Sequence, residues 1–133
     1  MPEFRMKDVV LDIPALLLNE KLTEKMQTGQ YEAAEARAAR RCVKPGHRVL
    51  ELGGGVGYIS AICAQITDPA NILTVEANPN TITVIRNNLD KNGATAAQVL
   101  HGAVVGDGVI GETLEFRVGR VFWGSSIADA EDL

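Results

Sequence analysis

The chain has 133 residues, of which 46% are hydrophobic and 23% charged, a composition typical of one globular domain with its own core. Its net charge of −4 argues against nucleic acid as an obligatory partner, because phosphate binding depends on clustered lysine and arginine. No apolar run approaches the ~20 residues needed to cross a bilayer, so we expect no membrane partner. The N-terminus has no secretion-signal pattern and the two cysteines lack metal-ligand spacing, so we expect a cytoplasmic protein without a metal site.

Residues 1–46 predict an N-terminal helical segment. A short β-like run at 9–11 comes first. An apolar residue then recurs at every fourth position over about 15–27, as in a helix with one apolar side. The alanine-rich stretch 31–42 predicts a second helix, which Pro45-Gly46 ends.

Residues 47–133 predict a Rossmann-like domain in which strands alternate with helices. This alternation favours a truncated, three-stranded parallel core. Strict alternation of polar and apolar residues over 112–118 predicts one more strand, which turns at Gly119-Arg120 into 121–123 and forms a C-terminal β-hairpin. The parallel strands are predicted at about 48–52, 71–76 and 98–105, and the helices between them at about 58–67 and 78–91.

The most informative pattern lies between the first of these strands and its helix, where the sequence reads Glu51-Leu52-Gly53-Gly54-Gly55-Val56-Gly57. Glycines let the backbone turn sharply and let a ligand lie against the main chain where a Cβ would clash. The helix that follows also offers free N–H groups to that ligand. A plain tight turn is the alternative, which four glycines in five positions disfavour.

The residues around this loop distinguish between ligands. A dinucleotide fingerprint needs glycine at position 58, where this chain has tyrosine, and no Walker lysine follows. The acid Glu51 favours a cationic amino-acid group over a pyrophosphate, and therefore S-adenosylmethionine over a nicotinamide cofactor. A nicotinamide-dependent oxidoreductase is the disfavoured alternative.

Glu76 ends the next predicted strand, at the crevice where open α/β sheets bind ligands. Its carboxylate can accept hydrogen bonds from both hydroxyls of a ribose. An exposed acid that caps the helix over 78–91 is the alternative. Together with the glycine loop, this acid indicates a cofactor that contains adenosine.

At these positions the sequence resembles the class I S-adenosylmethionine-dependent methyltransferases, and more narrowly the FkbM family. The resemblance runs over about residues 28–127. Its motifs are Gly29-Gln30-Tyr31-Glu32, the run from Lys44 to Gly53, Val75-Glu76-Ala77-Asn78-Pro79-Asn80, Asn87-Asn88 with Asn92-Gly93, Ala103-Val104 and Gly124-Ser125-Ser126.

The resemblance implies a role for each matching residue. The acid and glycines of the loop would face the methionine part of the cofactor, the second acid the ribose, and the residues after the later strands the adenine. Tyr31 and Glu32 would cover the cofactor from the N-terminal side, with an N-terminal helix cap as the open alternative. The implied cofactor-binding residues are Glu51, Gly53, Gly55, Gly57, Glu76, Ala77, Asn78, Gly102, Ala103 and Tyr31.

The resemblance also implies a methyltransferase, with O-methyl transfer to a hydroxyl of a small molecule or sugar. We identify no catalytic base, since His101 and Asp107 both read more simply as structural residues. Family members continue into a further strand with an acidic motif, which this chain lacks. A non-catalytic cofactor-binding or assembly module is therefore the alternative. The unpaired side of the strand at 49–52 predicts a homodimer, with the hairpin over 112–123 folded back as a cover as the other possibility.

Overall fold

The computed structural model of the chain describes residues 1–108, 111, 115–117 and 126–127. Its strands are β1 (Glu3–Met6), β2 (Val9–Asp12), β3 (Val49–Leu52), β4 (Ile72–Glu76), β5 (Gln98–His101), β6 (Phe116–Arg117) and β7 (Ser126–Ile127). Its α-helices are α1 (Glu20–Gln27), α2 (Ala33–Cys42), α3 (Tyr58–Ala64) and α4 (Pro79–Lys91), and two short 3-10 helices lie at Ala15–Leu17 and Pro69–Asn71.

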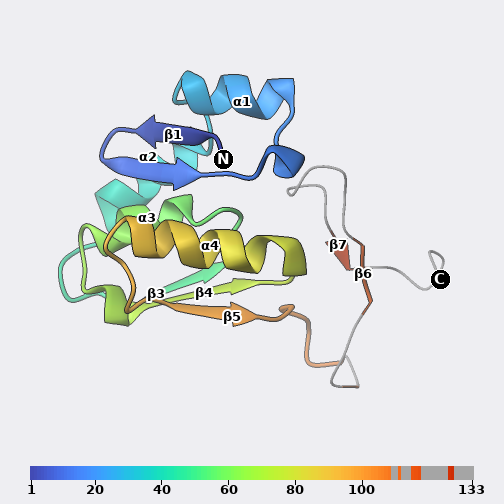
Figure 1. Cartoon of the computed structure of the whole chain (residues 1–133). Coiled ribbons are helices and arrows are strands. Elements are labelled where there is room, and N and C mark those ends of the chain that lie inside the picture. The colour runs from blue at the N-terminus through green and yellow to red at the C-terminus, as the bar shows by residue number, and fades with distance from the viewer. Residues whose placement is uncertain (109–110, 112–114, 118–125, 128–133) are drawn as a thin grey trace.

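The central sheet contains β3, β4 and β5 in that order, and all three strands are parallel. The helices α3 and α4 cover one face of this sheet, the hairpin β1–β2 lies over those helices, and α1 lies beyond the hairpin (Figure 1). Strands that alternate with crossover helices produce this parallel arrangement. The predicted Rossmann-like α/β fold with a three-stranded parallel core is therefore confirmed.

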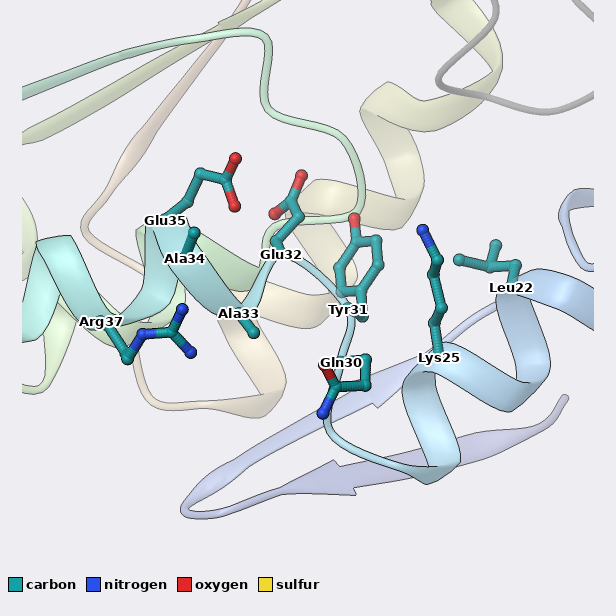
Figure 2. Close-up of a pocket in the computed structure, with 9 residues that line it drawn as sticks. All are labelled: Leu22, Lys25, Gln30, Tyr31, Glu32, Ala33, Ala34, Glu35 and Arg37. Atoms are coloured by element: carbon teal, nitrogen blue, oxygen red, sulfur yellow. The ribbon is translucent and has the colours of Figure 1, made fainter.

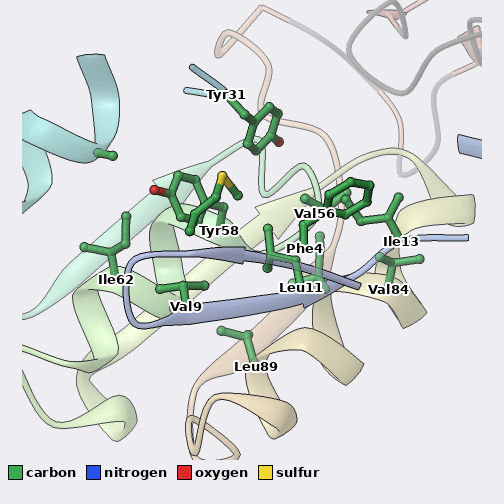
Figure 3. Packing of buried hydrophobic residues seen from close by; sticks show 14 of the residues in the cluster. Phe4, Val9, Leu11, Ile13, Tyr31, Val56, Tyr58, Ile62, Val84 and Leu89 are labelled. Carbon is green, nitrogen blue, oxygen red and sulfur yellow. The ribbon is translucent and has the colours of Figure 1, made fainter. Parts of the chain in front are cut away.

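One hydrophobic core joins the N-terminal segment to the sheet and its helices. Side chains of the hairpin β1–β2 meet those of α3 and α4 (Figure 3). The largest fully buried apolar side chains are Val9, Leu11, Ile13, Leu22, Met26, Val56, Ile62, Ile72, Ile85 and Leu89. The boundary proposed at residue 46 thus does not separate two cores among the described residues.

Two asparagines, Asn88 of α4 and the C-cap residue Asn92, hydrogen-bond the free edge of β2. The Asn88 Oδ1 accepts from the Asp12 N–H at 2.8 Å, and its amide donates to the Asp12 carbonyl at 3.1 Å. One helical turn later, the Asn92 side chain makes the same pair of bonds to the main chain of Val10, at 3.0 and 2.7 Å. A helical turn rises about as far as two strand residues, so the two asparagines replace a neighbouring strand.

Several predicted boundaries were wrong for local reasons. The sequence indicated only the second strand of the N-terminal hairpin, because β1 is short and polar on its outer side. The helix expected over 15–27 is broken, since the Asn19 side chain accepts from the Leu22 N–H and starts α1 at Glu20. The strand expected over 98–105 ends at His101.

The C-terminal strands also differ from the prediction. An antiparallel pair does form, but Phe116 pairs with Ile127 and Arg117 with Ser126, not with the predicted partner strand at 121–123. The predicted turn at 119–120 and the whole of that partner strand at 121–123 lie outside the described residues.

The second face of the parallel sheet is open to solvent among the described residues. Leu50, Leu52 and Leu100 are 62%, 57% and 53% exposed on it. The strand β3 pairs only with β4, and β6–β7 form a sheet of their own rather than extending β3. The unpaired strand edge predicted at 49–52 is therefore present in the described part, whereas the homodimer stays a prediction. None of the described helices is long and apolar enough to span a membrane.

Candidate cofactor-binding site

The carboxyl ends of the three parallel strands bring the predicted site residues to one edge of the sheet. Main-chain hydrogen bonds fix the loops there. The Gly53 N–H donates to the Val75 carbonyl at 2.7 Å, and the Gly102 N–H donates to the Glu76 carbonyl at 3.0 Å. Ligands of open α/β sheets bind at this edge.

The glycines after β3 have two different structural roles. Gly53 and Gly55 have φ values of +87° and +59°, in the left-handed region that glycine adopts most readily. A Cβ on Gly53 would meet nothing within 4 Å, so this side of the loop is open. A Cβ on Gly54 would lie 2.7 Å from the Thr74 Oγ1, and one on Gly57 would lie 3.3 Å from the Ile85 carbonyl oxygen. Packing therefore requires glycine at 54, and at 57 a tight contact adds to a left-handed φ of +92° that favours glycine. The predicted ligand contact of Gly57 stays a prediction.

Glu76 joins the glycine loop to the loop after β4. Its Oε1 accepts from the Gly55 N–H at 3.1 Å, and its Oε2 accepts from the Asn78 N–H at 2.8 Å. The cap of α4 is the Asn78 side chain, which accepts from the Asn80 N–H at 2.9 Å. The alternative of Glu76 as an exposed helix cap was therefore wrong. Each carboxylate oxygen keeps a further lone pair for a ligand.

Glu51 lies partly buried beneath the loop. Its Oε1 accepts from the Ser60 hydroxyl at 2.6 Å and from the Thr74 hydroxyl at 2.9 Å. Burial raises the pKa of this carboxyl, the two hydroxyl hydrogen bonds oppose that rise, and the charge of Glu76 adds to it. A cation bound here would offset the energetic cost of burying the Glu51 carboxylate and its repulsion by Glu76.

Tyr31 and Glu32 approach the same region from the start of α2. The ring of Tyr31 packs on that of Tyr58, with centroids 5.7 Å apart (Figure 3). Glu32 is the N-cap residue of α2, yet its side chain makes no capping hydrogen bond. Glu32 therefore occupies the N-cap position of the alternative, although its side chain does not cap the helix, and covering of the cofactor by Tyr31 and Glu32 stays a prediction.

The residues predicted near adenine follow β4 and β5. The His101 Nε2 donates to the Ala77 carbonyl at 3.1 Å, which ties the two loops together. Ala77 and Gly102 are partly buried, whereas Ala103 and Asp107 are exposed. Asn78 is 2% exposed and its oxygen is used by the cap, so the contact of its side chain with a ligand stays a prediction.

These residues fit S-adenosylmethionine on three counts. The open side of Gly53 leaves room for a ligand against the main chain. Glu76 has two oriented oxygens that could accept from ribose hydroxyls, and Glu51 has a partly desolvated carboxylate that a cation could neutralise. Within the described residues, no group of three or more metal-ligating side chains lies together.

Fold and site together define a class I S-adenosylmethionine-dependent methyltransferase domain. Comparison with known families is more specific: the TRM5/TYW2 methyltransferase domain matches residues 23–108, and the chain belongs to this family. Its cofactor is S-adenosylmethionine, which confirms the cofactor predicted from the sequence. The narrower resemblance to the FkbM family stays a prediction.

Curated relatives are named as methyltransferases too. A protein-L-isoaspartate O-methyltransferase of Methanopyrus kandleri is 40% identical over 80 residues, which are 59% of this chain and 34% of that protein. One of Methanothrix thermoacetophila is 28% identical over 106 residues, which are 76% of this chain and 49% of that protein. The chain thus spans about a third to a half of the length of these relatives.

Proposed function

We propose that the chain binds S-adenosylmethionine at the carboxyl edge of its sheet and forms the cofactor half of an O-methyltransferase. The observation that carries this proposal is the position of Glu76, whose carboxylate bridges the Gly55 and Asn78 N–H groups. This bridge couples the glycine loop to the ribose position, so both parts of the site are oriented before the cofactor arrives.

Bound S-adenosylmethionine supplies a methyl group that its sulfonium already activates. The chain's own residues then have to hold and orient the cofactor. Glu51 pairs with the α-ammonium group of its amino-acid end, Glu76 fixes the ribose, and the glycine loop lets the main chain approach. In-line transfer depends on such alignment more than on further chemistry by the protein.

For the acceptor we propose a protein carboxylate. The names of the relatives support an oxygen acceptor on a protein, and the net charge of −4 disfavours a polyanion such as tRNA, although the family description includes TRM5/TYW2. The hydroxyl of a small molecule or sugar, predicted from the sequence, is the other oxygen acceptor to test.

The acceptor is tested with S-adenosylmethionine that carries a tritiated methyl group. We expect label on a peptide with L-isoaspartate, none on the matched aspartate peptide, and loss of labelling in Glu76→Ala. Label on tRNA alone, or on small hydroxyl compounds alone, would reject the protein acceptor.

A non-catalytic module is the second candidate function. The open sheet face with Leu50, Leu52 and Leu100 supports it, because such a face suits association with another chain or segment. Cofactor binding without transfer to any of these acceptors would favour this candidate.

A further inference from the structure

Asn88 connects three parts of the structure through one side-chain amide. This residue of α4 is fully buried, and besides its two bonds to the main chain of Asp12, its Nδ2 donates to the Val56 carbonyl at 2.8 Å. Val56 belongs to the glycine loop and is fully buried too. An asparagine amide has two N–H donors, of which one binds the hairpin β1–β2 and the other the loop. The loop is thus held on its buried side, whereas its side at Gly53 is open.

The bond to Val56 orients the peptide unit that closes the glycine turn. Asn88 holds the carbonyl of this unit, and the N–H of the same unit, that of Gly57, donates to the Gly54 carbonyl at 2.9 Å. Because a peptide unit is planar, a partner for each of its two polar groups fixes its orientation. Gly55, with its φ of +59°, lies inside this turn. Its position therefore depends on the bond that Asn88 makes.

Asn92, one helical turn later, offers a direct comparison. Its side chain makes the same pair of bonds to the main chain of Val10 that Asn88 makes to Asp12. The Asn92 Nδ2 also donates to the Asn88 carbonyl of α4, at 2.7 Å, where the Asn88 Nδ2 donates to the glycine loop. The two asparagines thus share the role of holding β2 and differ in the bond to Val56.

The other neighbours of the N-terminal segment orient the loop less directly. A cavity of about 490 Å³ lies between α1 and the start of α2, where Glu32, with a left-handed φ of 45°, leads the chain into the helix (Figure 2). Apolar packing joins the hairpin to the sheet helices, and Val56 lies in that core with Phe4 and Leu11 (Figure 3). Apolar packing has no direction, whereas a hydrogen bond orients the carbonyl that accepts it.

We propose that Asn88 is a positioning residue of the cofactor site, which holds the glycine loop in its binding conformation through the Val56 carbonyl. The inference rests on the proposed function, because it concerns the same bound cofactor. Asn88 is fully buried, so it acts through the main chain of the loop. Without its bond the turn reaches other conformations, and the affinity falls with the fraction of chains that stay competent to bind. The hairpin β1–β2, bonded to the same amide, is thereby part of the support of the site.

The test compares Asn88→Ala with the matched control Asn92→Ala in the full-length chain. Both variants lose a pair of bonds to β2, and Asn88→Ala also loses the bond to the loop. Isothermal titration calorimetry measures the affinity for S-adenosylmethionine at a temperature where circular dichroism shows both variants folded. Nuclear magnetic resonance records the amide signals of Gly55 and Gly57 in the free chain, which the loss of bonds to β2 alone should not move.

Asn88→Ala should bind S-adenosylmethionine about tenfold more weakly than the parent, as expected for the loss of one orienting hydrogen bond. Its Gly55 and Gly57 signals should shift or broaden. Asn92→Ala should keep the affinity of the parent and the same signals at both glycines. Parental affinity or unchanged glycine signals in Asn88→Ala would overturn the proposal, and so would equal weakening of the two variants.

A measurement on the parent chain covers the case in which Asn88→Ala does not fold. A bond that favours binding is itself favoured by binding, so saturation with S-adenosylmethionine should slow hydrogen exchange of the Asn88 side-chain amide about tenfold more than that of Asn92. Equal slowing would overturn the role of Asn88 and leave the proposed function standing, since saturation requires binding. A parent chain that binds no S-adenosylmethionine would overturn the proposed function and this inference with it.

Discussion

Glu76→Ala removes the group that joins the two halves of the site. The Gly55 and Asn78 N–H groups lose their acceptor, at 3.1 and 2.8 Å, and two ribose hydroxyls lose theirs when the cofactor binds. Water reaches this partly buried position, so we expect the loss of the main-chain bonds to lower the free energy of unfolding by only about 1–2 kcal/mol. The loss of the ribose bonds should weaken S-adenosylmethionine by about 1.5–3 kcal/mol, or ten- to a hundredfold.

Isothermal titration calorimetry measures the affinity, and urea denaturation measures the free energy of unfolding of the same samples. Glu76→Gln keeps one acceptor oxygen and should lose about half of the binding free energy that Glu76→Ala loses. Asp90→Ala is the control, because Asp90 is an exposed acid of α4 that pairs with Arg86. Equal affinity of Glu76→Ala and the parent would remove Glu76 from the site and refute the reasoning.

Three further predictions follow from the described contacts. Gly53→Ala should weaken cofactor binding at least tenfold, as measured by calorimetry, while the free energy of unfolding falls by only about 1–2 kcal/mol. Gly54→Ala should lower the free energy of unfolding by about 1–3 kcal/mol, as measured by urea denaturation, because its Cβ would clash with Thr74. Equal behaviour of the two variants in both assays would contradict these two roles. The raised pKa of Glu32, about 7, means that the folded state holds this proton more tightly than the unfolded one, so the free energy of unfolding should fall by about 1–2 kcal/mol from pH 5 to pH 8, and Glu32→Gln should remove most of that fall. Asn88→Ala leaves main-chain groups of Asp12 without a partner and should cost about 2–4 kcal/mol in the same assay; a cost below 0.5 kcal/mol would contradict this bridge.

The parallel core was predictable because its signals are local. Apolar runs, the glycines from 53 to 57 and the Asn78-Pro79 helix start each depend on neighbouring residues, and the structure has each of them in place. The position of Glu76 at the sheet edge was predictable for the same reason, since this residue ends a strand that the local pattern indicates.

Long-range contacts were not predictable in this way. The bonds from Asn88 and Asn92 to β2 join residues more than seventy positions apart, and no local pattern indicates them. The role of Tyr58 was also missed. The sequence showed that Tyr58 breaks the dinucleotide fingerprint. That Tyr58 packs on Tyr31 became visible only in the fold. A left-handed glutamate likewise leaves no signal in a sequence.

The most direct test of the central claim is equilibrium binding of S-adenosylmethionine to the purified full-length chain, measured by calorimetry in parallel with NAD. The account predicts saturable binding of one S-adenosylmethionine per chain and no binding of NAD, because Tyr58 replaces the third glycine of the dinucleotide fingerprint. Binding of NAD in preference to S-adenosylmethionine, or binding of neither by a folded chain, would contradict it.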